Sequence, residues 1–200
     1  MKKFIALALS VLCLAAFCSC GKSIKFEHGV IDGDTYTNKS LDVKFTKPSD
    51  WTFKTDEEIA QIMNISIEEY MKSGEMMDSD KLAQATEFMA ADNSTGNNVN
   101  MAVAKVAKSL TIEKYIESFK KQVTEQLTAN MTVNFDDGQS EVDLGGNKYI
   151  HLSSVVKVSS IEMHQHYYIR KVGNYMLVIT ATGVTTSDSS FFEKMISKAE

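Results

Sequence analysis

Residues 145–181 read GGNKYIHLSSVVKVSSIEMHQHYYIRKVGNYMLVITA, and this stretch decides the fold. It holds three long runs rich in β-branched and aromatic residues, which predict strands. The runs cover residues 148–159, 161–172 and 175–181. Gly145-Gly146 before the first run is a hairpin signal, and Gly173-Asn174 predicts a tight turn between the last two. Because strands joined by short hairpins pair antiparallel, we expect an antiparallel meander.

The chain before the meander adds a hairpin and one long helix. Strand-like runs at residues 85–91 and 99–107 flank a polar turn at 92–98, so we expect two paired strands. Between residues 111 and 127, apolar side chains recur three and four positions apart, which predicts an amphipathic helix. Its apolar positions are Ile112, Tyr115, Ile116, Phe119, Val123 and Leu127.

Shorter elements complete the order. Alternation along residues 41–46 predicts a strand, and Thr55 and Ser66 are expected to begin two helices. A last helix should follow the polar run 187–190. Helices grouped between runs of strands cover the faces of a sheet, so we expect an α+β fold with a central antiparallel β-sheet flanked by helices.

Residues 36–59 carry the pattern Y-x-N-x-x-L-x-V-x-F-x-x-P-x-x-W-x-F-x-x-D-E-E-I. This pattern resembles the start of a group of small bacterial lipoproteins of the PsbP-like fold group, which also includes the Ran-binding Mog-type proteins. The resemblance implies a PsbP-like α/β/α sandwich, in which helices cover both sides of the sheet. Pro48 fixes a turn and Trp51 fills apolar space, so the matched residues bear on fold rather than on function.

The first residues have the features of an export signal. A basic start, Met1-Lys2-Lys3, precedes an apolar stretch of about a dozen residues, whereas a spanning helix needs about 20. The end of this stretch resembles a bacterial lipobox, which implies cleavage before a cysteine that then carries lipid. Small Ser19 precedes Cys20 and suits this cut, while bulky Phe17 precedes Cys18. We expect lipidation at Cys20, with Cys18 or ordinary cleavage as the alternatives.

This interpretation divides the chain into a signal peptide (1–19), a flexible tether (20–34) and a single PsbP-like domain (35–200). Two of the three cysteines leave with the signal, so the exported domain has no thiol for a disulfide or a nucleophile. Loss of Lys2 and Lys3 leaves 19 basic against 26 acidic residues, and such a domain lacks the basic surface that nucleic acid requires. We expect the protein on a bacterial cell membrane, held by its lipid and facing outside the cytoplasm, at the cell surface or in the periplasm.

Glu162, His164 and His166 share one face of the strand expected at 161–172, because side chains alternate along a strand. Two imidazoles and a carboxylate are suitable ligands for a metal such as zinc. Side chains diverge from a flat strand, so a site would need a further ligand from a neighbouring strand, with His151 or Asp143 as candidates. The alternative is a solvated strand face without a ligand.

No established catalytic or cofactor motif occurs in the sequence. The G-x-S-x-G, H-E-x-x-H and P-loop patterns are absent, and we expect no cofactor. The acidic runs at 78–80 and 136–137 lack the EF-hand spacing and predict turns rather than calcium sites. Ser153 and Ser154 lie near His151 in the sequence but no motif supports either as a nucleophile.

These observations favour a non-enzymatic binding or accessory lipoprotein, which presents its domain to a protein partner or a small ligand. Two other classes remain open. One is a metal-binding protein that uses the Glu162, His164 and His166 face, and the other is a hydrolase with an unrecognised site.

Overall fold

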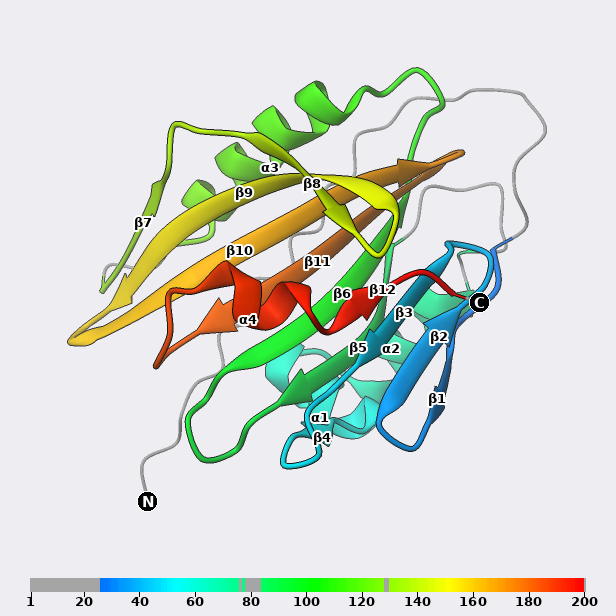
Figure 1. Ribbon diagram of the computed structural model, residues 1–200, viewed down its shortest axis with the longest axis horizontal. Coiled ribbons are helices and arrows are strands. Elements are labelled where there is room, and N and C mark those ends of the chain that lie inside the picture. The colour runs from blue at the N-terminus through cyan, green and yellow to red at the C-terminus, as the bar shows by residue number, and fades with distance from the viewer. Residues whose placement is uncertain (1–25, 76, 78–83, 128–129, 200) are drawn as a thin grey trace.

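The computed structural model describes residues 26–75, 77, 84–127 and 130–199. Within these ranges an eight-stranded antiparallel sheet forms the centre of the molecule, in the order β4-β5-β6-β11-β10-β9-β7 with β8 also paired to β9 (Figure 1). The strands are β4 Thr52–Phe53, β5 Gln84–Ala91, β6 Asn98–Lys105, β7 Met131–Phe135, β8 Ser140–Leu144, β9 Asn147–Val158, β10 Ile161–Val172 and β11 Tyr175–Gly183. The predicted meander is confirmed as β9, β10 and β11.

A second, smaller antiparallel sheet lies against one face of the central sheet. In the described residues it has the order β1-β2-β3-β12, with β1 at Val30–Asp32, β2 at Thr35–Asn38, β3 at Val43–Thr46 and β12 at Ile196–Ser197. The short helix α4, Ser189–Glu193, precedes β12 and lies over the same face (Figure 1). This sheet therefore joins the two ends of the described chain.

The opposite face of the central sheet carries the longer helices. Helix α3, Ile112–Glu125, buries Tyr115, Ile116 and Phe119 against strands β9, β10 and β11. Helices α1, Asp56–Met63, and α2, Ile67–Glu75, pack on β5. Thr55 begins α1 with a capping box, and Thr111 caps α3.

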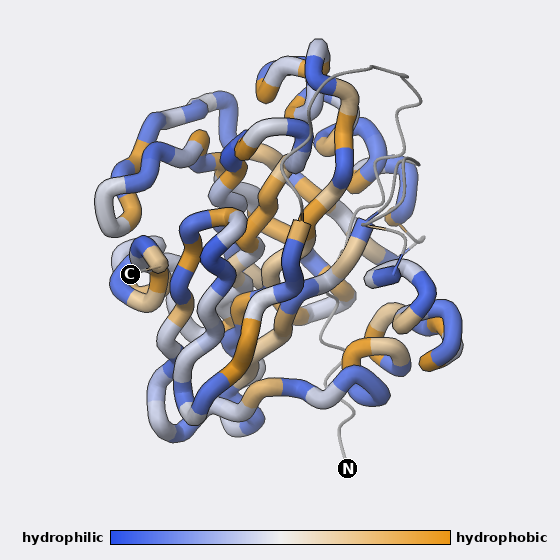
Figure 2. The backbone as a smooth tube through the Cα atoms, turned by 90° about the vertical axis from the view of Figure 1, so that its right-hand side faces the viewer, coloured by the Kyte–Doolittle hydropathy of each residue, from blue (hydrophilic) through white to orange (hydrophobic). Residues whose placement is uncertain are grey.

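Aromatic side chains join the two sheets into the main core. The Phe88 ring on β5 lies 4.6 Å from Phe45 of β3 and 4.7 Å from Tyr36 of β2, measured between ring centroids. Such contacts add to the burial of apolar area in holding the layers together. Figure 2 shows the apolar positions concentrated on the strands inside the molecule, with polar residues along the outer loops.

The observed layers differ from expectation in one respect. The antiparallel sheet and its flanking helices are present. We expected helices on both faces of the central sheet, but the face that contacts Phe45 is covered mostly by the second sheet, together with the short α4. The reason is that β1, β2, β3 and β12 pair with one another and bury one common face. Helices on the other face are as expected.

The expected tether extends too far into the chain. The signal peptide and residues 20–25, including Cys20, lie outside the described residues. Residues 26–34 belong to the fold, because Phe26 is buried in the main core and Val30–Asp32 form β1 on the edge of β2. Polar and glycine-rich composition predicted a tether here, whereas long-range contacts order this segment. None of the helices in the described part of the chain has both the length and the apolar character to cross a bilayer.

Candidate functional site

A β-bulge in β5 creates the most distinctive polar site of the fold. Thr86 pairs with Ala102 on β6 and Phe88 pairs with the adjacent Met101, so Glu87 is an extra residue in β5. A bulge bends its strand and redirects the side chain of the extra residue. The Glu87 side chain turns toward the segment that contains His28 and β2.

The Glu87 carboxylate is almost completely removed from solvent, with 1% of its side chain exposed. Its Oε1 lies 2.7 Å from His28 Nδ1. Its Oε2 accepts hydrogen bonds from the Gly29 backbone N–H at 2.9 Å, the Tyr36 hydroxyl at 2.6 Å and Asn38 Nδ2 at 3.3 Å. These donors replace the water that a buried carboxylate loses, and they attach the N-terminal segment to β5.

The pKa values around Glu87 follow from this arrangement. Burial alone would raise the pKa of Glu87, but hydrogen bonds from His28, Tyr36 and Gly29 outweigh it, and the pKa is lowered. Burial, together with the charge and hydrogen bond of Glu87, raises the pKa of Tyr36. At neutral pH the carboxylate is therefore ionised and the phenol remains a donor.

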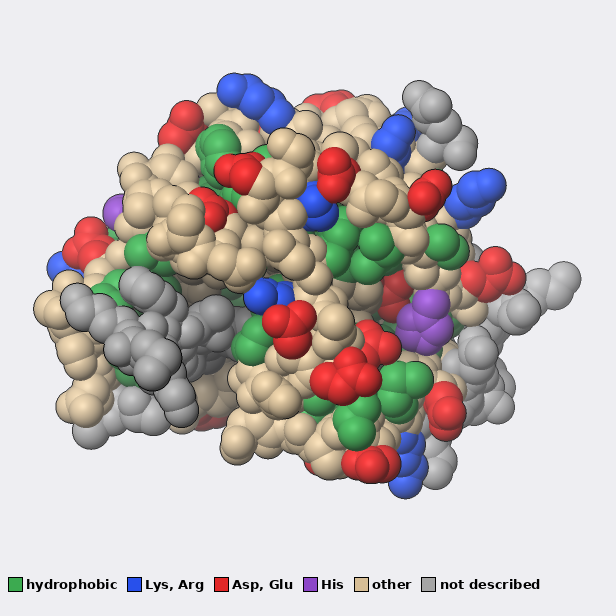
Figure 3. Space-filling view, turned by 90° about the horizontal axis from the view of Figure 1, so that it is seen from below, with side chains coloured by type: hydrophobic (Ala, Val, Ile, Leu, Met, Phe, Trp, Pro, Cys, Tyr) green, Lys and Arg blue, Asp and Glu red, His purple; other side chains and the backbone are tan. Residues whose placement is uncertain are grey.

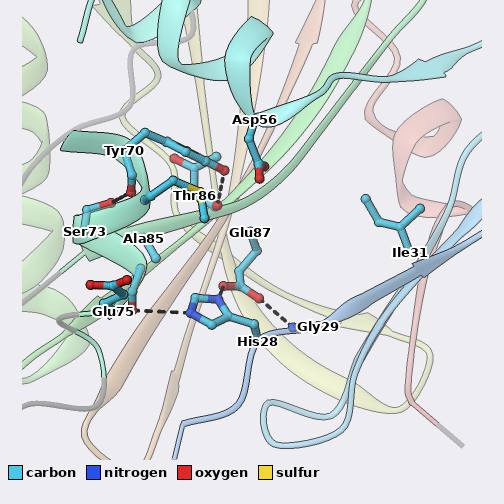
Figure 4. A pocket seen from close by; sticks show the side chains of 12 residues that line it. His28, Gly29, Ile31, Asp56, Tyr70, Ser73, Glu75, Ala85, Thr86 and Glu87 are labelled. Atoms are coloured by element: carbon cyan, nitrogen blue, oxygen red, sulfur yellow. Dashed lines mark hydrogen bonds and ion pairs between the residues drawn. The ribbon is translucent and has the colours of Figure 1, made fainter. Parts of the chain in front are cut away.

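His28 connects this carboxylate to the end of α2. Its Nε2 lies 3.3 Å from the carbonyl oxygen of Gly74, while Nδ1 faces Glu87, and about half of its side chain is exposed. Both neighbouring oxygens are acceptors, so the ring makes both hydrogen bonds at once only when both nitrogens carry a proton. Figure 4 shows the imidazole between the two groups.

A pocket of about 510 Å³ opens beside these residues, between β1, α1, α2 and β5 (Figure 4). This volume is within the range of small-molecule sites in proteins. The lining residues are His28, Gly29, Ile31, Asp56, Tyr70, Met71, Ser73, Gly74, Glu75, Ala85, Thr86 and Glu87.

The lining combines acidic and acceptor groups with an apolar rim. Asp56 and Glu75 are exposed carboxylates, and no lysine or arginine is among the lining residues. The Tyr70 hydroxyl donates to the Thr86 carbonyl at 3.0 Å, and burial, with the nearby charges of Asp56 and Glu87, raises the pKa of Tyr70. Ile31 and Met71 are apolar lining side chains that remain exposed. On the face drawn in Figure 3, acidic and hydrophobic side chains lie close to a histidine side chain.

Glu87 and Ser73 of this pocket already make hydrogen bonds within the fold. Both oxygens of Glu87 accept hydrogen bonds, which makes the carboxylate a weak base. Ser73 Oγ donates to the Tyr70 carbonyl of its own helix at 2.6 Å. A serine nucleophile would need a base as its acceptor instead.

The predicted metal ligands do not form one cluster: Glu162 and His164 lie together, whereas His166 contacts His151. Glu162 forms an ion pair with Lys157 at 2.8 Å, and its other oxygen lies 3.5 Å from His164 Nε2. His166 is 7% exposed, and its Nδ1 lies 3.1 Å from His151 Nε2. Among the described residues, no three His, Cys, Asp or Glu side chains gather in a geometry that could hold a metal ion.

The strand face with these residues is also less solvated than the alternative interpretation assumed. Tyr168 on the same face is fully buried in the main core, and Phe192 of α4 packs near the His166 ring. Burial lowers the pKa of both His151 and His166. The face is therefore partly covered by α4 and the second sheet.

The remaining predicted candidates have structural partners. Asp143 accepts from the Gly146 backbone N–H within the β8–β9 hairpin. Ser153 Oγ donates to Asp136, and Ser154 Oγ contacts the Tyr167 hydroxyl at 3.2 Å on the other face of β9. His151 is the one neighbouring candidate that meets a predicted ligand, His166.

Sequence reasoning missed the pocket residues. The predicted tether includes His28 and Gly29, and Asp56 enters the sequence analysis only as part of the pattern at residues 36–59. One signal was available, because Glu87 is the single charged residue of the strand predicted at 85–91. A charged residue at such a position indicates either a strand at the edge of the sheet or a buried group that pairs with the charge.

Comparisons with known proteins leave the family open. No protein-family model matches the chain, and no curated protein sequence matches it. The crystal structure of a protein from Bacteroides thetaiotaomicron VPI-5482 is similar over 85% of this chain and 50% of that one, with 13% identity and a TM-score of 0.48. The chain thus spans about half the length of that protein. A similarity this weak carries no conclusion about function.

Proposed function

We propose that this protein is a membrane-anchored, extracytoplasmic lipoprotein whose folded domain is a non-catalytic binding module. The ligand site is the pocket between β1, α1, α2 and β5. The observation that carries the proposal is the pocket of about 510 Å³ beside a buried, ionised Glu87. A fixed charge network next to an apolar rim is typical of a site that orients a ligand.

The anchoring part of the proposal depends on the sequence. Cys20 follows a short apolar stretch and a small residue, and the mature chain is acidic. An acidic domain gains no attraction from anionic lipid, so acyl chains on Cys20 would hold it at the membrane. We further propose a PsbP-like fold, on the strength of the Y-x-N and Pro-x-x-Trp pattern at residues 36–51.

Filling the pocket tests the binding function. Ser73 lines the pocket and is half-buried, so Ser73→Leu places an isobutyl group in the cavity. The matched control is Gln61→Leu, at an exposed position of α1 outside the lining. A metabolite screen by thermal shift should find ligands that raise the Tm of the wild type and of Gln61→Leu but not of Ser73→Leu. Ligands that stabilise all three proteins equally would contradict the proposal.

A metal-binding function remains a second candidate because Glu162 lies 3.5 Å from His164. His166 would have to exchange its contact with His151 for the metal. Zinc or manganese titration of the purified protein tests this candidate, with His164→Ala and His166→Ala as variants. Binding that both substitutions weaken would support it, and binding that neither changes would exclude this site.

A further inference from the structure

We propose that the pocket takes an organic cation, namely a primary ammonium or guanidinium group on an aliphatic stem. The inference rests on the proposed binding function and specifies its ligand class. It is drawn from the hydrogen-bonding groups, the charges and the apolar rim of the pocket. Figure 4 shows how these groups surround the opening.

The pocket offers acceptors rather than donors. Asp56 and Glu75 contribute carboxylates, and the carbonyl oxygens of Gly74 and Thr86 face the same region through their contacts with His28 and Tyr70. The Ser73 hydroxyl is already used as a donor within α2. An ammonium or guanidinium group carries only donors, so it complements this set, whereas a carboxylate or phosphate would meet other acceptors.

The charges of the lining residues also favour a cationic ligand. Three carboxylates line the pocket, and Glu87 is held ionised by its hydrogen bonds. His28 is the one basic side chain among the described lining residues. Its two ring nitrogens face the Glu87 carboxylate and the Gly74 carbonyl oxygen, so the histidine already occupies these two acceptors. Asp56 and Glu75 are exposed carboxylates of the lining that can attract a cation.

The rim explains why the cation should carry a stem. Ile31 and Met71 are lining side chains with about half of their surface exposed. They offer apolar contact to methylene groups, and a methionine adapts to different stem shapes. A bare metal ion fits less well, because no three His, Cys, Asp or Glu side chains of the described residues gather to hold one.

Two natural sources of this chemistry can be separated by the probes. One is a free diamine, represented by 1,5-diaminopentane, and the other is a lysine side chain, represented by the capped tripeptide Gly-Lys-Gly. The uncharged twin of the second probe is Gly-norleucine-Gly, which keeps most of the stem and lacks the ammonium group. Titration calorimetry with the purified protein at low ionic strength gives each affinity.

The variants remove charge and keep shape. The double variant Asp56→Asn and Glu75→Gln neutralises the two exposed carboxylates of the lining. Its control, Glu57→Gln with Glu68→Gln, neutralises two exposed carboxylates of α1 and α2 outside the lining. Each removed charge should weaken an ammonium probe roughly five- to tenfold at low ionic strength, and added salt should reduce this difference.

The expected result is that at least one ammonium probe binds and the norleucine peptide binds at least tenfold more weakly. The double variant should lose most of that affinity, while its control keeps it. Equal binding of the lysine and norleucine peptides, or equal affinity of both double variants, would overturn the ammonium assignment and leave the pocket as a binding site. Ammonium binding that Ser73→Leu does not weaken would show that the ligand binds elsewhere, and it would contradict the proposal that this pocket is the ligand site.

Discussion

A carboxylate loses several kcal/mol of hydration on burial unless hydrogen bonds replace its water, and Glu87 has four such partners. Two of them, His28 and Gly29, come from the first residues of the described fold, and two, Tyr36 and Asn38, come from β2. Gly29 also has to lack a side chain, since a Cβ there would lie 2.3 Å from the Tyr36 ring. Glu87, the extra residue of the bulge, therefore holds in place the segment with His28 and Gly29 that forms one wall of the pocket.

Glu87→Gln should lower the free energy of unfolding by about 2 kcal/mol at neutral pH, because an amide replaces an ionised acceptor and brings unmatched donors. The pKa of Glu87 is lowered in the fold, so its stabilisation is fully present above the unfolded-chain pKa. It is lost as the pH falls through the lower folded pKa. The difference between wild type and variant should therefore shrink in acid, which urea denaturation at several pH values measures.

The control for this experiment is Glu141→Gln. Glu141 forms an exposed ion pair with Lys148 at 2.6 Å, and exposed pairs contribute about 0–1 kcal/mol. Its substitution should change stability little at any pH. A Glu87→Gln effect that stays constant from neutral pH into acid would show that the charge of Glu87 does not stabilise the fold.

At the scale of elements, the β8–β9 hairpin is the feature most tightly specified by sequence. Its two central residues, Gly145 and Gly146, have φ of 61° and 88°, a conformation that favours glycine in a two-residue turn. The turn also lies against the C-terminal strand, because a Cβ on Gly145 would be 2.6 Å from the Ser197 Cα atom. The hairpin and β12 therefore constrain each other.

Gly145→Ala should destabilise the protein by about 2 kcal/mol or more, from backbone strain and from the clash with β12. The matched control is Gly138→Ala, where a Cβ meets nothing within 4 Å and the backbone has no positive φ. Chemical denaturation of both variants measures the difference. Equal stability of the two would contradict the close packing of the turn against β12.

Elements with a strong internal pattern could be predicted from the sequence. The meander β9–β11 and helix α3 occur within one or two residues of expectation, because their periodicity and turns are local signals. Strands β1 and β12 could not be predicted, since three and two residues carry no periodicity and long-range partners hold them. The bulge at Glu87 was hidden for the same reason, because it depends on the register with β6.

At the scale of the whole molecule, the distance in sequence from Cys20 to Phe26, the first described residue, limits the reach of the proposed anchor. Phe26 follows Cys20 by six positions, and an extended chain spans at most about 3.5 Å per residue. A lipid on Cys20 would thus hold the domain within roughly 20 Å of the bilayer. The pocket lies next to this end of the fold, since His28 and Gly29 line it.

Cys20→Ala should release the protein from membranes, because the acyl chains that this cysteine is proposed to carry provide the binding free energy. Cell fractionation with detection of the protein measures the outcome. Cys18→Ala is the matched control and should remain in the membrane fraction. Retention of Cys20→Ala on membranes, or release of Cys18→Ala, would show that the lipid is not attached at Cys20.

The central claim, that the pocket beside Glu87 is the ligand site, is tested most directly by locating a bound probe. Backbone amide shifts of the purified protein can be followed by NMR while 1,5-diaminopentane is added to saturation. We predict that the largest changes occur at Gly29, Gly74 and Glu87, which surround the pocket. Changes centred on the His151 and His166 face would contradict the claim.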